Sequence, residues 1–361
     1  MKVAIVYDRV NKWGGAERVL LVLHELFPSA PLYTSVYDPV KAPWAKVFPK
    51  IVTSFLQKVP GAKASHEYFA LLMPLAFEQF DFSPFDLAIS VTSEAAKGII
   101  TKPGTIHICY CLTPTRYLWS GYELYFENRL FRSLTAQMVK YLRAWDKVAA
   151  QRPDRIVAIS KEVQKRIKKY YNLESKIIYP PVSVKYNSLA NPNLPKRFYL
   201  LVSRLVPYKR VDFAIKAFNK LGYPLVIIGT GREEESLKRG ARRNIVFTGQ
   251  LTDEELSDYY EKCTALIFPQ EEDFGIVAVE AQLFGKPVIA YAKAGALDSV
   301  IPGETGILFE EQNSDSLIDA VKRFEKTDFE AEKIVKNAKR FSKSRFKKEF
   351  LKLVEDAKQQ F

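Results

Sequence analysis

The sequence predicts an α/β protein made of two doubly wound domains, and three observations support this prediction. Strand-like apolar runs alternate with helical patterns along the chain, which is typical of parallel sheets with helices on both faces. The chain of 361 residues is too long for one ordinary core and suits two domains. A connector rich in proline and asparagine separates two such alternating series.

The first series predicts a Rossmann-like domain over residues 1–180. Its apolar runs predict strands, and its 3.6-residue patterns predict helices. The strands are expected at 3–7, 32–36, 87–91, 105–111 and 155–159, and the helices at 15–27, 64–79, 128–150 and 160–171. The longest apolar stretch, Tyr68 to Phe77, contains Pro74 and is shorter than the roughly 20 residues of a membrane-spanning helix. No segment is therefore expected to span a membrane.

The second series predicts another Rossmann-like domain over 196–341, after a connector at 181–195. Its strands are expected at 198–202, 225–228, 245–247, 265–268 and 288–290. Each strand ends in a turn followed by a helix, so the strand ends of the two domains are expected to face a central cleft. The last segment, within 342–361, reads as a basic amphipathic helix.

The charge of the chain predicts a negatively charged partner or surface. The formal net charge is +13. Basic residues crowd the region 140–169, with Lys161, Lys165 and Lys168 at helical spacing. This cluster is consistent with an anionic membrane surface and equally with a generally basic, well-solvated surface. The sequence shows no nucleic-acid recognition module, so no nucleic-acid partner is expected.

The cysteines and histidines are too few for a disulfide framework or a metal site. Cys109, Cys111 and Cys263 are badly spaced for disulfides and are expected in the core. No Cys/His or Asp-x-Asp cluster has the spacing of metal ligands, which predicts chemistry without a metal or other cofactor. The amino terminus is strand-like and lacks the longer apolar core of a secretion signal. We expect a cytoplasmic protein, with a peripheral place on the inner membrane face as an option.

The chemistry is expected at a loop, residues 269–275, that runs straight into an apolar helix pattern. The loop follows a predicted strand, and open α/β sheets bind ligands at such strand ends. Glu272 lies in the loop and Glu280 in the helix. A helix start attracts an anion such as a diphosphate. The backbone groups at this start belong to Phe274, Gly275, Ile276 and Val277. The alternative interpretation is a capped helix with two solvated glutamates.

Two further turns, Gly285-Lys286-Pro287 and Gly303-Glu304-Thr305-Gly306, follow this loop. With them, the stretch resembles the donor-binding domain of the retaining glycosyltransferases of family 4. The resemblance implies the GT-B fold, in which a terminal helix crosses back onto the first domain. It also implies that Glu280 accepts hydrogen bonds from the ribose of a nucleotide sugar. Glu272 would then face the transferred sugar and its developing positive charge.

Arg204 and Lys209 stand in the turn after the first strand of the second domain, beside a helix start. They match the family's diphosphate-binding Arg and Lys, which implies that they stabilise the leaving diphosphate in place of a metal. The alternative is a surface loop with two ordinary basic residues. By the same resemblance the nucleotide base would lie near residues 247–251, which include Gly249 and Leu251.

Two glycine turns are further candidates for donor binding. Gly14, Gly15 and Ala16 lie between the first predicted strand and the first predicted helix, where glycine lets backbone amides approach a phosphate or sugar. The family has the same turn, although the fold alone could also require it. Gly229 begins a fragment of a dinucleotide fingerprint whose third glycine is missing, and we expect it to border the nucleotide.

The stretch from Cys109 to Trp119 narrows the resemblance to the WbaZ-like mannosyltransferases of surface polysaccharide assembly. Relatives commonly carry a histidine where this chain has Leu112, and a second common histidine is Glu94 here. His107 has the opposite strand parity and cannot replace the first. Because leucine favours an apolar neighbour, a 6-deoxy sugar such as rhamnose is an alternative to mannose.

Two residues of the same stretch, Arg116 and Tyr117, are candidates for binding an acceptor sugar or a lipid phosphate. The alternative is an aromatic cluster that anchors the loop.

The resemblance as a whole implies a metal-independent, retaining hexosyltransferase. The expected donor is a nucleotide sugar, GDP-mannose first, and the expected acceptor is a lipid-linked glycan or polysaccharide at the inner membrane face. A donor with a 6-deoxyhexose or a UDP-sugar is one alternative. A nucleotide-sugar-binding protein without transfer activity is another, from a different class. A dinucleotide-dependent oxidoreductase would need a complete glycine fingerprint, which neither half supplies.

Overall fold

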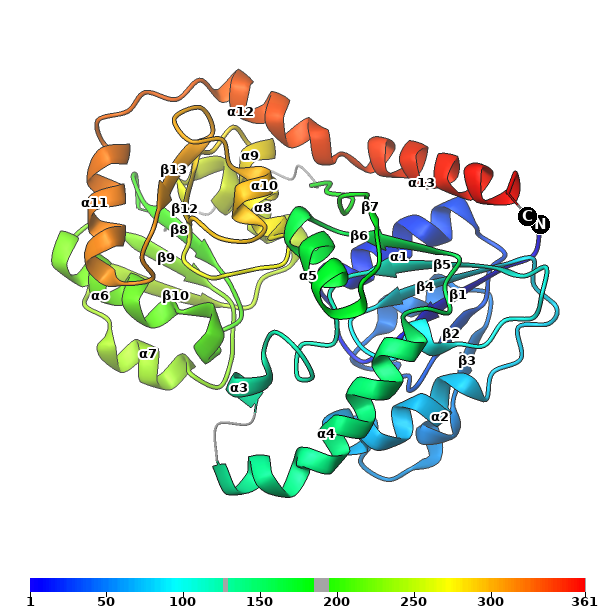
Figure 1. The fold of residues 1–361 in the computed structure, drawn as a ribbon. Coiled ribbons are helices and arrows are strands. Elements are labelled where there is room, and N and C mark those ends of the chain that lie inside the picture. The colour runs from blue at the N-terminus through cyan, green and yellow to red at the C-terminus, as the bar shows by residue number, and fades with distance from the viewer. Residues whose placement is uncertain (126–128, 185–194, 361) are drawn as a thin grey trace. The chain divides into compact units, whose positions relative to one another are not determined.

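The computed structural model describes residues 1–125, 129–184 and 195–360, and it divides into two compact units (Figure 1). The first unit comprises Met1–Pro181 and Phe346–Phe361, and the second comprises Val182–Arg345. Each unit holds one all-parallel sheet with helices around it, so the predicted fold class is confirmed. Of the predicted connector, residues 185–194 lie outside the described residues.

The first unit is built on a seven-stranded sheet with the order β3-β2-β1-β4-β5-β6-β7. The strands predicted in this half are present, with ends that differ by one or two residues. Two short strands at the edges, β3 and β7, were not predicted. The strands are β1 (Val3–Tyr7), β2 (Leu32–Thr34), β3 (Ile51–Thr53), β4 (Leu87–Thr92), β5 (Ile106–Cys111), β6 (Arg155–Ala158) and β7 (Lys176–Ile177).

The helices of the first unit follow the predicted pattern except at 64–79, where two helices replace one. Pro74 lies in the first turn of the second helix, and a new helix begins there because proline fits a first turn but not a helix interior. The longer helices are α1 (Gly15–Leu26), α2 (Met73–Glu78), α4 (Arg129–Ala149), α5 (Lys161–Tyr171) and α13 (Lys343–Lys358), with the short α3 (Tyr122–Tyr125). The 3₁₀ helices are η1 (Pro43–Val47), η2 (Phe55–Lys58), η3 (His66–Leu72) and η4 (Ala96–Gly98).

The last helix, α13, packs on the first unit through its apolar side. The ring of Tyr110 in β5 lies 5.7 Å from the ring of Phe346 and 6.4 Å from that of Phe350. Lys347 forms an ion pair of 2.8 Å with Glu25 of α1. Among the described residues, no helix combines the length and the apolar character needed to cross a membrane.

The second unit is built on a six-stranded sheet with the order β10-β9-β8-β11-β12-β13. The predicted strands of this half are present. β13, which begins at Gly306 of the turn 303–306, was not predicted as a strand. The strands are β8 (Tyr199–Val202), β9 (Leu225–Ile228), β10 (Ile245–Gly249), β11 (Leu266–Phe268), β12 (Val288–Tyr291) and β13 (Gly306–Phe309).

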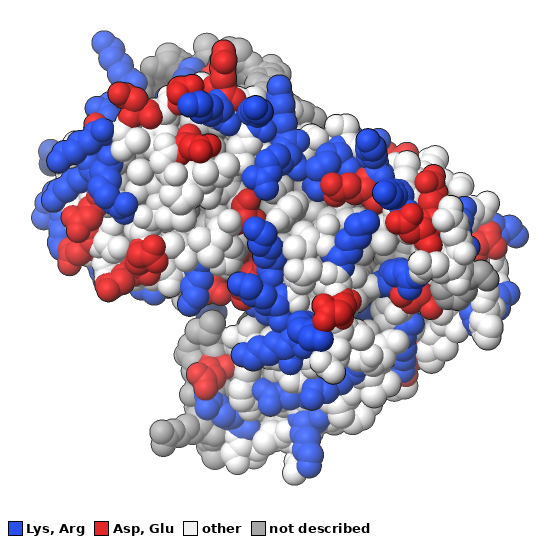
Figure 2. Space-filling model, turned by 45° about the horizontal axis from the view of Figure 1, so that its top comes forward, with Lys and Arg blue, Asp and Glu red and all other residues white. Residues whose placement is uncertain are grey.

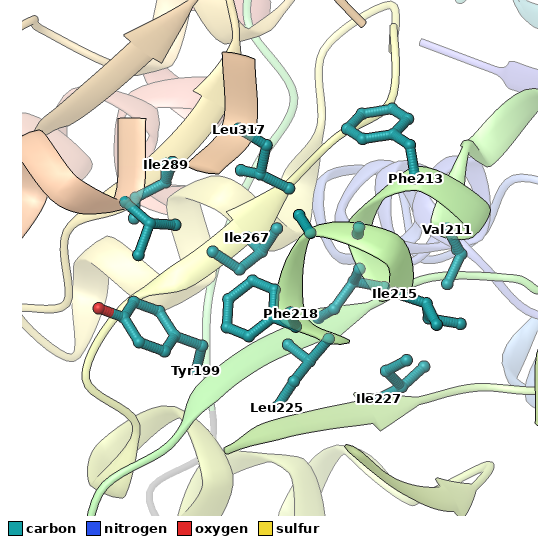
Figure 3. Packing of buried hydrophobic residues seen from close by; sticks show 14 of the residues in the cluster. Tyr199, Val211, Phe213, Ile215, Phe218, Leu225, Ile227, Ile267, Ile289 and Leu317 are labelled. Carbon is teal, nitrogen blue, oxygen red and sulfur yellow. The ribbon is translucent and has the colours of Figure 1, made fainter. Parts of the chain in front are cut away.

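Helices cover both faces of this sheet, as side-chain alternation along the strands requires. One face carries Tyr199 and Ile267 and packs against Phe218 of α6 and Leu317 of α11 (Figure 3). The other carries Leu200 and packs against α8 and α9. The helices are α6 (Val211–Leu221), α7 (Glu234–Gly240), α8 (Asp253–Lys262), α9 (Ile276–Leu283), α10 (Ala296–Ser299), α11 (Ser314–Phe324) and α12 (Ala331–Ala338), with the 3₁₀ helices η5 (Pro207–Lys209) and η6 (Lys339–Phe341).

The chain passes from one unit to the other twice, after Pro181 and after Arg345. Backbone contacts connect the segments near these two places. The N–H of Val182 donates to the carbonyl of Phe341 over 2.8 Å. Val182 also forms a parallel bridge with Ser342. The first residue of the second unit therefore pairs with the segment that leads into α13.

Candidate active site

The strand order of the second unit places a topological switch point between β8 and β11. The chain forms β8, β9 and β10 in one direction and then returns to add β11 on the other side of β8. Loops that leave neighbouring strands in opposite directions open a crevice at the carboxyl ends, which is the usual ligand site of such sheets. The loop after β8 carries Arg204 and Lys209, and the loop after β11 carries Glu272 and Gly275.

Lys209 and Glu272, one from each of these loops, form an ion pair between Nζ and Oε1. The Lys209 side chain is 8% exposed and that of Glu272 is 24% exposed. A buried ammonium is costly without an opposite charge, and the carboxylate supplies it here. The backbone of the Glu272 loop is held as well, because the N–H of Gly295 donates to the Glu272 carbonyl over 2.8 Å. The structure therefore brings the predicted cation and the predicted carboxylate into direct contact.

Arg204 is exposed, and Arg204 and Lys209 both lie next to the aromatic ring of Tyr208. The guanidinium of Arg204 contacts the Tyr208 hydroxyl. Its Cζ lies 5.9 Å from the Tyr208 ring centroid, and Lys209 Nζ lies 5.0 Å from the same centroid. An aromatic face attracts cations, so Tyr208 holds two positive groups together that would otherwise repel each other. Sequence reasoning did not single out Tyr208.

The turn at Gly229 packs directly against the loop that carries Arg204. A Cβ on Gly229, whose φ is +132°, would lie 1.9 Å from the carbonyl oxygen of Ser203. A Cβ on Gly231 would lie 2.2 Å from the carbonyl oxygen of Leu205. These glycines are required because two backbone segments touch. Gly229 thus positions the Arg204 loop, and contact with a nucleotide stays a prediction.

The start of α9 is formed by Gly275, which has a φ of +83°. A Cβ there would lie 2.5 Å from the Phe268 ring, so both the positive φ and this close contact require glycine. Ile276 and Val277 are the first helical residues and are half-buried. Phe274 is buried, and its ring packs on Phe341 at 5.3 Å. Phe274 could therefore meet a donor only through its backbone.

Glu280, the second predicted carboxylate, lies in α9 and is buried. The hydroxyl of Tyr260 donates to its Oε2 over 2.9 Å. This hydrogen bond fixes the orientation of the carboxylate. Gly249 ends β10 with a φ of +76°, and Leu251 is half-buried against the core on the α8 and α9 face. The ribose and base contacts expected of these residues stay predictions.

The first unit has its own switch point, between β1 and β4, and charged groups meet there too. The buried carboxylate of Asp8 accepts from the N–H groups of Ser93 at 2.7 Å and Ala96 at 2.9 Å, and from the Thr92 hydroxyl at 2.9 Å. Burial first, and then the charge of Glu94, raise the pKa of Asp8. Asp8 shapes the loop after β4, a role that sequence reasoning missed.

Next to Asp8, Arg9 forms an ion pair with Glu94, and both side chains are largely buried. Glu94 stands at the position where the resemblance implies a histidine, and here it forms this ion pair. Asp8, an acidic residue directly after an apolar strand, was the sequence signal for this site. The pairing of Arg9 with Glu94 was not evident from the sequence.

The glycine turn of the first unit begins α1. Gly14 precedes the helix, and a Cβ on it would lie 3.2 Å from the carboxylate of Glu17. Glu17 is buried and accepts from the Tyr7 hydroxyl over 2.6 Å. Gly15 and Ala16 form the first turn of α1. The close approach to Glu17 gives the turn a structural reason, and donor contact remains a prediction.

The acceptor candidates are Leu112, directly after β5, and Arg116 and Tyr117, in the loop that follows. Leu112 is half-buried, and its N–H donates to the Thr92 carbonyl over 2.8 Å. Arg116 and Tyr117 are half-buried, and burial raises the pKa of Tyr117. Trp119, at the end of this loop, stacks on Tyr170 at 5.1 Å. The contacts of Trp119 agree with the alternative in which aromatic rings anchor the loop.

A buried ion pair beneath this loop links four segments of the chain. Lys97 Nζ lies 2.6 Å from Asp146 Oδ1, and each side chain is 1% exposed. The same carboxylate accepts from Thr115, Trp119 and Tyr171 at 2.8, 2.7 and 2.7 Å. Desolvation of the carboxylate is thus offset by four donors, which ties α4 and α5 to the loops after β4 and β5.

In the basic region 140–169, some side chains form ion pairs and several are exposed to solvent. Arg152 pairs with Glu78, Arg166 with Glu162 and Lys168 with Glu174. Exposed members include Lys140, Lys147, Lys161 and Lys165. On the face shown in Figure 2, Lys and Arg side chains are spread widely, with smaller groups of acidic side chains between them.

The buried cysteines and His107 behave as core residues. Cys109, Cys111 and Cys263 are buried thiols, as predicted. His107 Nε2 lies 2.8 Å from the Ser90 hydroxyl in the neighbouring strand, and burial lowers its pKa to about 3. Among the described residues, no group of three or more His, Cys, Asp or Glu side chains is placed to hold a metal ion. Metal independence stays a prediction.

The family comparison concerns mainly the second unit. Residues 188–341 match the family model described as "Glycosyl transferases group 1". An uncharacterized glycosyltransferase of Methanocaldococcus jannaschii, MJ1178, is 29% identical over 206 residues, which cover 56% of this chain and 58% of that protein. D-rhamnosyltransferase WbpZ of Pseudomonas aeruginosa is 28% identical over 222 residues, or 58% and 57% of the two chains. O-antigen chain mannosyltransferase C of Escherichia coli is 24% identical over 213 residues, or 54% and 55%.

The chain thus spans little more than half the length of these curated relatives. A likeness of fold extends further. The structure of Anabaena Alr3699/HepE in complex with UDP superposes with a TM-score of 0.73 at 18% identity, covering 99% of this chain and 100% of that one. The expected GT-B fold is therefore confirmed, and residues 188–341 of the chain match the group 1 glycosyl transferases.

Proposed function

We propose that this protein is a retaining glycosyltransferase that transfers a hexose, in the first place mannose from GDP-mannose, to a lipid-linked or polysaccharide acceptor of cell-surface glycan biosynthesis. The observation that carries the proposal is the contact of Lys209 with Glu272 at the switch point between β8 and β11. That contact lies inside the segment that matches the group 1 glycosyl transferases.

The residues at this switch point suit the leaving group of such a reaction. A departing nucleoside diphosphate gains negative charge, which Arg204 and Lys209 would neutralise. The amides at the start of α9, after Gly275, would receive the same phosphates. Glu272 would face the transferred sugar as positive charge develops on its anomeric carbon. The departing phosphate would take the proton of the acceptor hydroxyl on the same face of the sugar, which retains the configuration.

The remaining candidates fit around this core of the site. The Glu280 carboxylate, oriented by Tyr260, would accept hydrogen bonds from the ribose, and the base would lie near Gly249 and Leu251. The acceptor would bind at the strand ends of the first unit, near Arg116 and Tyr117. A nucleotide-sugar donor needs no further cofactor in this scheme, and the enzyme would work at the cytoplasmic side of the membrane.

A 6-deoxyhexose donor is the second candidate, because of Leu112. This half-buried leucine stands where the family's histidine would contact the sugar near its hydroxymethyl group, and an apolar wall suits a methyl group better than a hydroxyl. WbpZ, one of the relatives, is named as a D-rhamnosyltransferase. Comparing transfer from GDP-mannose with transfer from a 6-deoxy GDP-sugar tests this candidate, and a clear preference for mannose would remove it.

Isothermal titration calorimetry in the presence of EDTA tests the main proposal. The protein is titrated with GDP, UDP, dTDP and ADP, and then with the matching sugar nucleotides. Selective binding of GDP and GDP-mannose is expected. Lys209→Met should weaken that binding, whereas Lys216→Met, at an exposed position of α6, should not. A preference for UDP would move the donor to a UDP-sugar, and the lack of any nucleotide binding would overturn the proposal.

A transfer assay separates the enzyme from a binding protein. Membrane extract that contains lipid-linked glycans is mixed with GDP-[14C]mannose and the protein, and label in the lipid fraction is counted. Label that depends on Glu272 supports transfer. Tight GDP-mannose binding without label in any acceptor fraction would favour a nucleotide-sugar-binding protein.

A further inference from the structure

An exposed tryptophan ring stands in the loop between β1 and α1 of the first unit. Trp13, directly before the turn at Gly14, is 41% exposed. The ring of Trp44 in η1 lies 6.1 Å from the Trp13 ring at an angle of 54°, and Cζ of Arg18 lies 6.0 Å from it. Scattered exposed apolar residues are ordinary, but a large aromatic ring that its neighbours hold in place is a preformed contact surface.

The loop that carries Trp13 is held by side-chain hydrogen bonds. The indole N–H of Trp44 donates to the carbonyl of Lys12 over 2.7 Å, and the side-chain amide of Asn11 donates to the carbonyl of Lys63 over 2.9 Å. The Trp44 ring in turn packs edge-on against Phe48 at 6.5 Å. A ligand that meets the Trp13 ring therefore does not have to order this loop, which lowers the cost of binding.

A polar pair belongs to the same loop. Arg9, four residues before Trp13, forms the ion pair with Glu94, and the two side chains are 14% and 15% exposed. Glu94 follows β4, the neighbour of β1, and its N–H donates to Asp8 Oδ2 over 3.1 Å. The guanidinium supplies hydrogen-bond donors and the carboxylate supplies acceptors. Both kinds of group, partly open to solvent, thus stand at the switch point of the first unit.

An aromatic ring together with such a pair suits a sugar ring. The C–H groups on one face of a pyranose pack on the negative face of an aromatic ring, and the hydroxyls at its edge exchange hydrogen bonds with planar charged groups. A phosphate at Arg9 would have to displace the Glu94 carboxylate, which already balances the charge of the guanidinium. The chemistry therefore favours a carbohydrate over a lipid phosphate.

We propose that Trp13, Arg9 and Glu94, supported by Trp44, form a subsite for a sugar ring of the acceptor. We call these residues the Trp13 subsite. The inference rests on the proposed function, because that function assigns the acceptor to the strand ends of the first unit. It deepens the proposed function by naming a glycan, and not a bare lipid phosphate, as the group that the enzyme extends.

Saturation-transfer NMR without nucleotide tests the Trp13 subsite. The full chain is titrated with mannobiose, cellobiose and lactose, and separately with citronellyl phosphate, which has a lipid phosphate but no sugar. Saturable binding of at least one disaccharide is expected, with the strongest transfer to the protons on one face of a sugar ring. Hydroxyl-radical footprinting read by mass spectrometry should show that the bound disaccharide protects Trp13 from oxidation.

Variants of the subsite give the size of the effect. Trp13→Ala should weaken disaccharide binding about tenfold, whereas Trp13→Phe keeps a ring and should stay within about threefold. Glu94→Gln keeps the shape of the side chain but removes its charge, and it should weaken binding about threefold or more. In the radiolabel transfer assay, Trp13→Ala should raise the amount of lipid-linked acceptor needed for the half-maximal rate, while the KM for GDP-mannose changes by less than about twofold.

Tyr141→Ala is the matched control, because it removes an exposed aromatic ring of the first unit from α4, outside the loops at the strand ends. This variant should bind disaccharide as the unchanged protein does. Circular dichroism verifies the fold of each variant, and GDP titration verifies the nucleotide site. Because the disaccharide is added without nucleotide, failure of the proposed donor site and failure of the Trp13 subsite are seen in different titrations.

Three outcomes would overturn the Trp13 subsite. One is the lack of saturable binding of any of the disaccharides. Another is the same disaccharide affinity in Trp13→Ala as in the unchanged protein, which together with weaker GDP-mannose binding would assign the ring to the donor. The third is citronellyl phosphate that displaces the disaccharide and binds more tightly in a Trp13-dependent way, because the loop would then serve a lipid phosphate.

Discussion

Lys209 and Glu272 form an ion pair although they belong to loops that follow different strands, β8 and β11. The Glu272 carboxylate thereby takes the place at Lys209 that a phosphate oxygen would take in the proposed donor complex. A bound diphosphate would have to compete for this ammonium, and Glu272 would then be released toward the sugar. Binding of the donor and placement of the Glu272 carboxylate would be linked in this way.

The first prediction concerns this competition. Glu272→Gln should leave GDP affinity unchanged or increase it, because the carboxylate charge that competes with a phosphate at Lys209 is removed. Transfer should fall about 100-fold or more, because the group that meets the developing positive charge is lost. Titration calorimetry measures the first quantity and a radiolabel transfer assay the second. Much weaker GDP binding in Glu272→Gln would show that the carboxylate helps to form the phosphate site and does not compete with it.

The second prediction concerns Tyr208, whose ring lies near both Arg204 and Lys209. Tyr208→Phe keeps the ring and should change the KM for the donor by less than about threefold, while Tyr208→Leu removes the attraction of about 1 kcal/mol per cation and should raise it about tenfold. The kcat should change less than KM in both variants if Tyr208 acts only by positioning the cations. Equal KM values for the Phe and Leu variants would exclude this role.

The third prediction concerns the close approach of the Gly229 turn to the Arg204 loop. Gly229→Ala should lower the free energy of unfolding by about 3 kcal/mol or more, because its Cβ would overlap the Ser203 carbonyl and its φ is unfavourable for alanine. Gly240→Ala is the matched control. A Cβ on Gly240 meets nothing within 4 Å, and this change should stay within about 0.5 kcal/mol. Urea denaturation compares the two, and equal stabilities would contradict the packing described here.

The fourth prediction follows from His107, whose pKa is lowered by burial to about 3. The unfolded chain has an ordinary histidine pKa, so below pH 6.5 it binds a proton that the folded protein does not. Stability from this residue is therefore fully present above pH 6.5 and is lost as the pH falls toward 3. Between pH 7 and pH 5 the loss should be about 2 kcal/mol.

The variant His107→Gln keeps an amide nitrogen near the Ser90 hydroxyl but cannot take up the proton. The difference in unfolding free energy between pH 7 and pH 5 should therefore be smaller for this variant than for the unchanged protein. Urea denaturation at the two pH values gives the comparison. The same loss in both proteins would assign the acid sensitivity to other groups.

The sequence predicted the elements whose information is local. β4 and β5 are fully buried apolar runs, and such runs between turns are recognisable without knowing their neighbours. β3 and β7 span three and two residues and are half-buried or exposed, so too little pattern exists to reveal them. The helix predicted at 64–79 is divided, because its backbone is non-helical at Phe69 and Pro74 fits only the first turn of α2.

The contacts of the site depend on strand order, which a local pattern does not contain. Glu272 and Lys209 were both expected at strand ends, but their pairing exists only because β11 lies beside β8. The same holds for Arg9 and Glu94, which meet because β4 lies beside β1. Asp8 was visible as an acid after an apolar strand, yet its role in shaping the next loop required the fold.

The pairing of Val182 with Phe341 and Ser342 has a consequence for the engineering of this chain. The second unit is one uninterrupted stretch, whereas the first is completed by residues from the far end of the sequence. In the sequence, the second unit lies between two parts of the first, and the segments at its two ends lie side by side. Second units from related proteins could be exchanged at these two ends, provided that every chimera keeps the native α13, whose Phe346 and Phe350 rings pack against Tyr110 of the first unit.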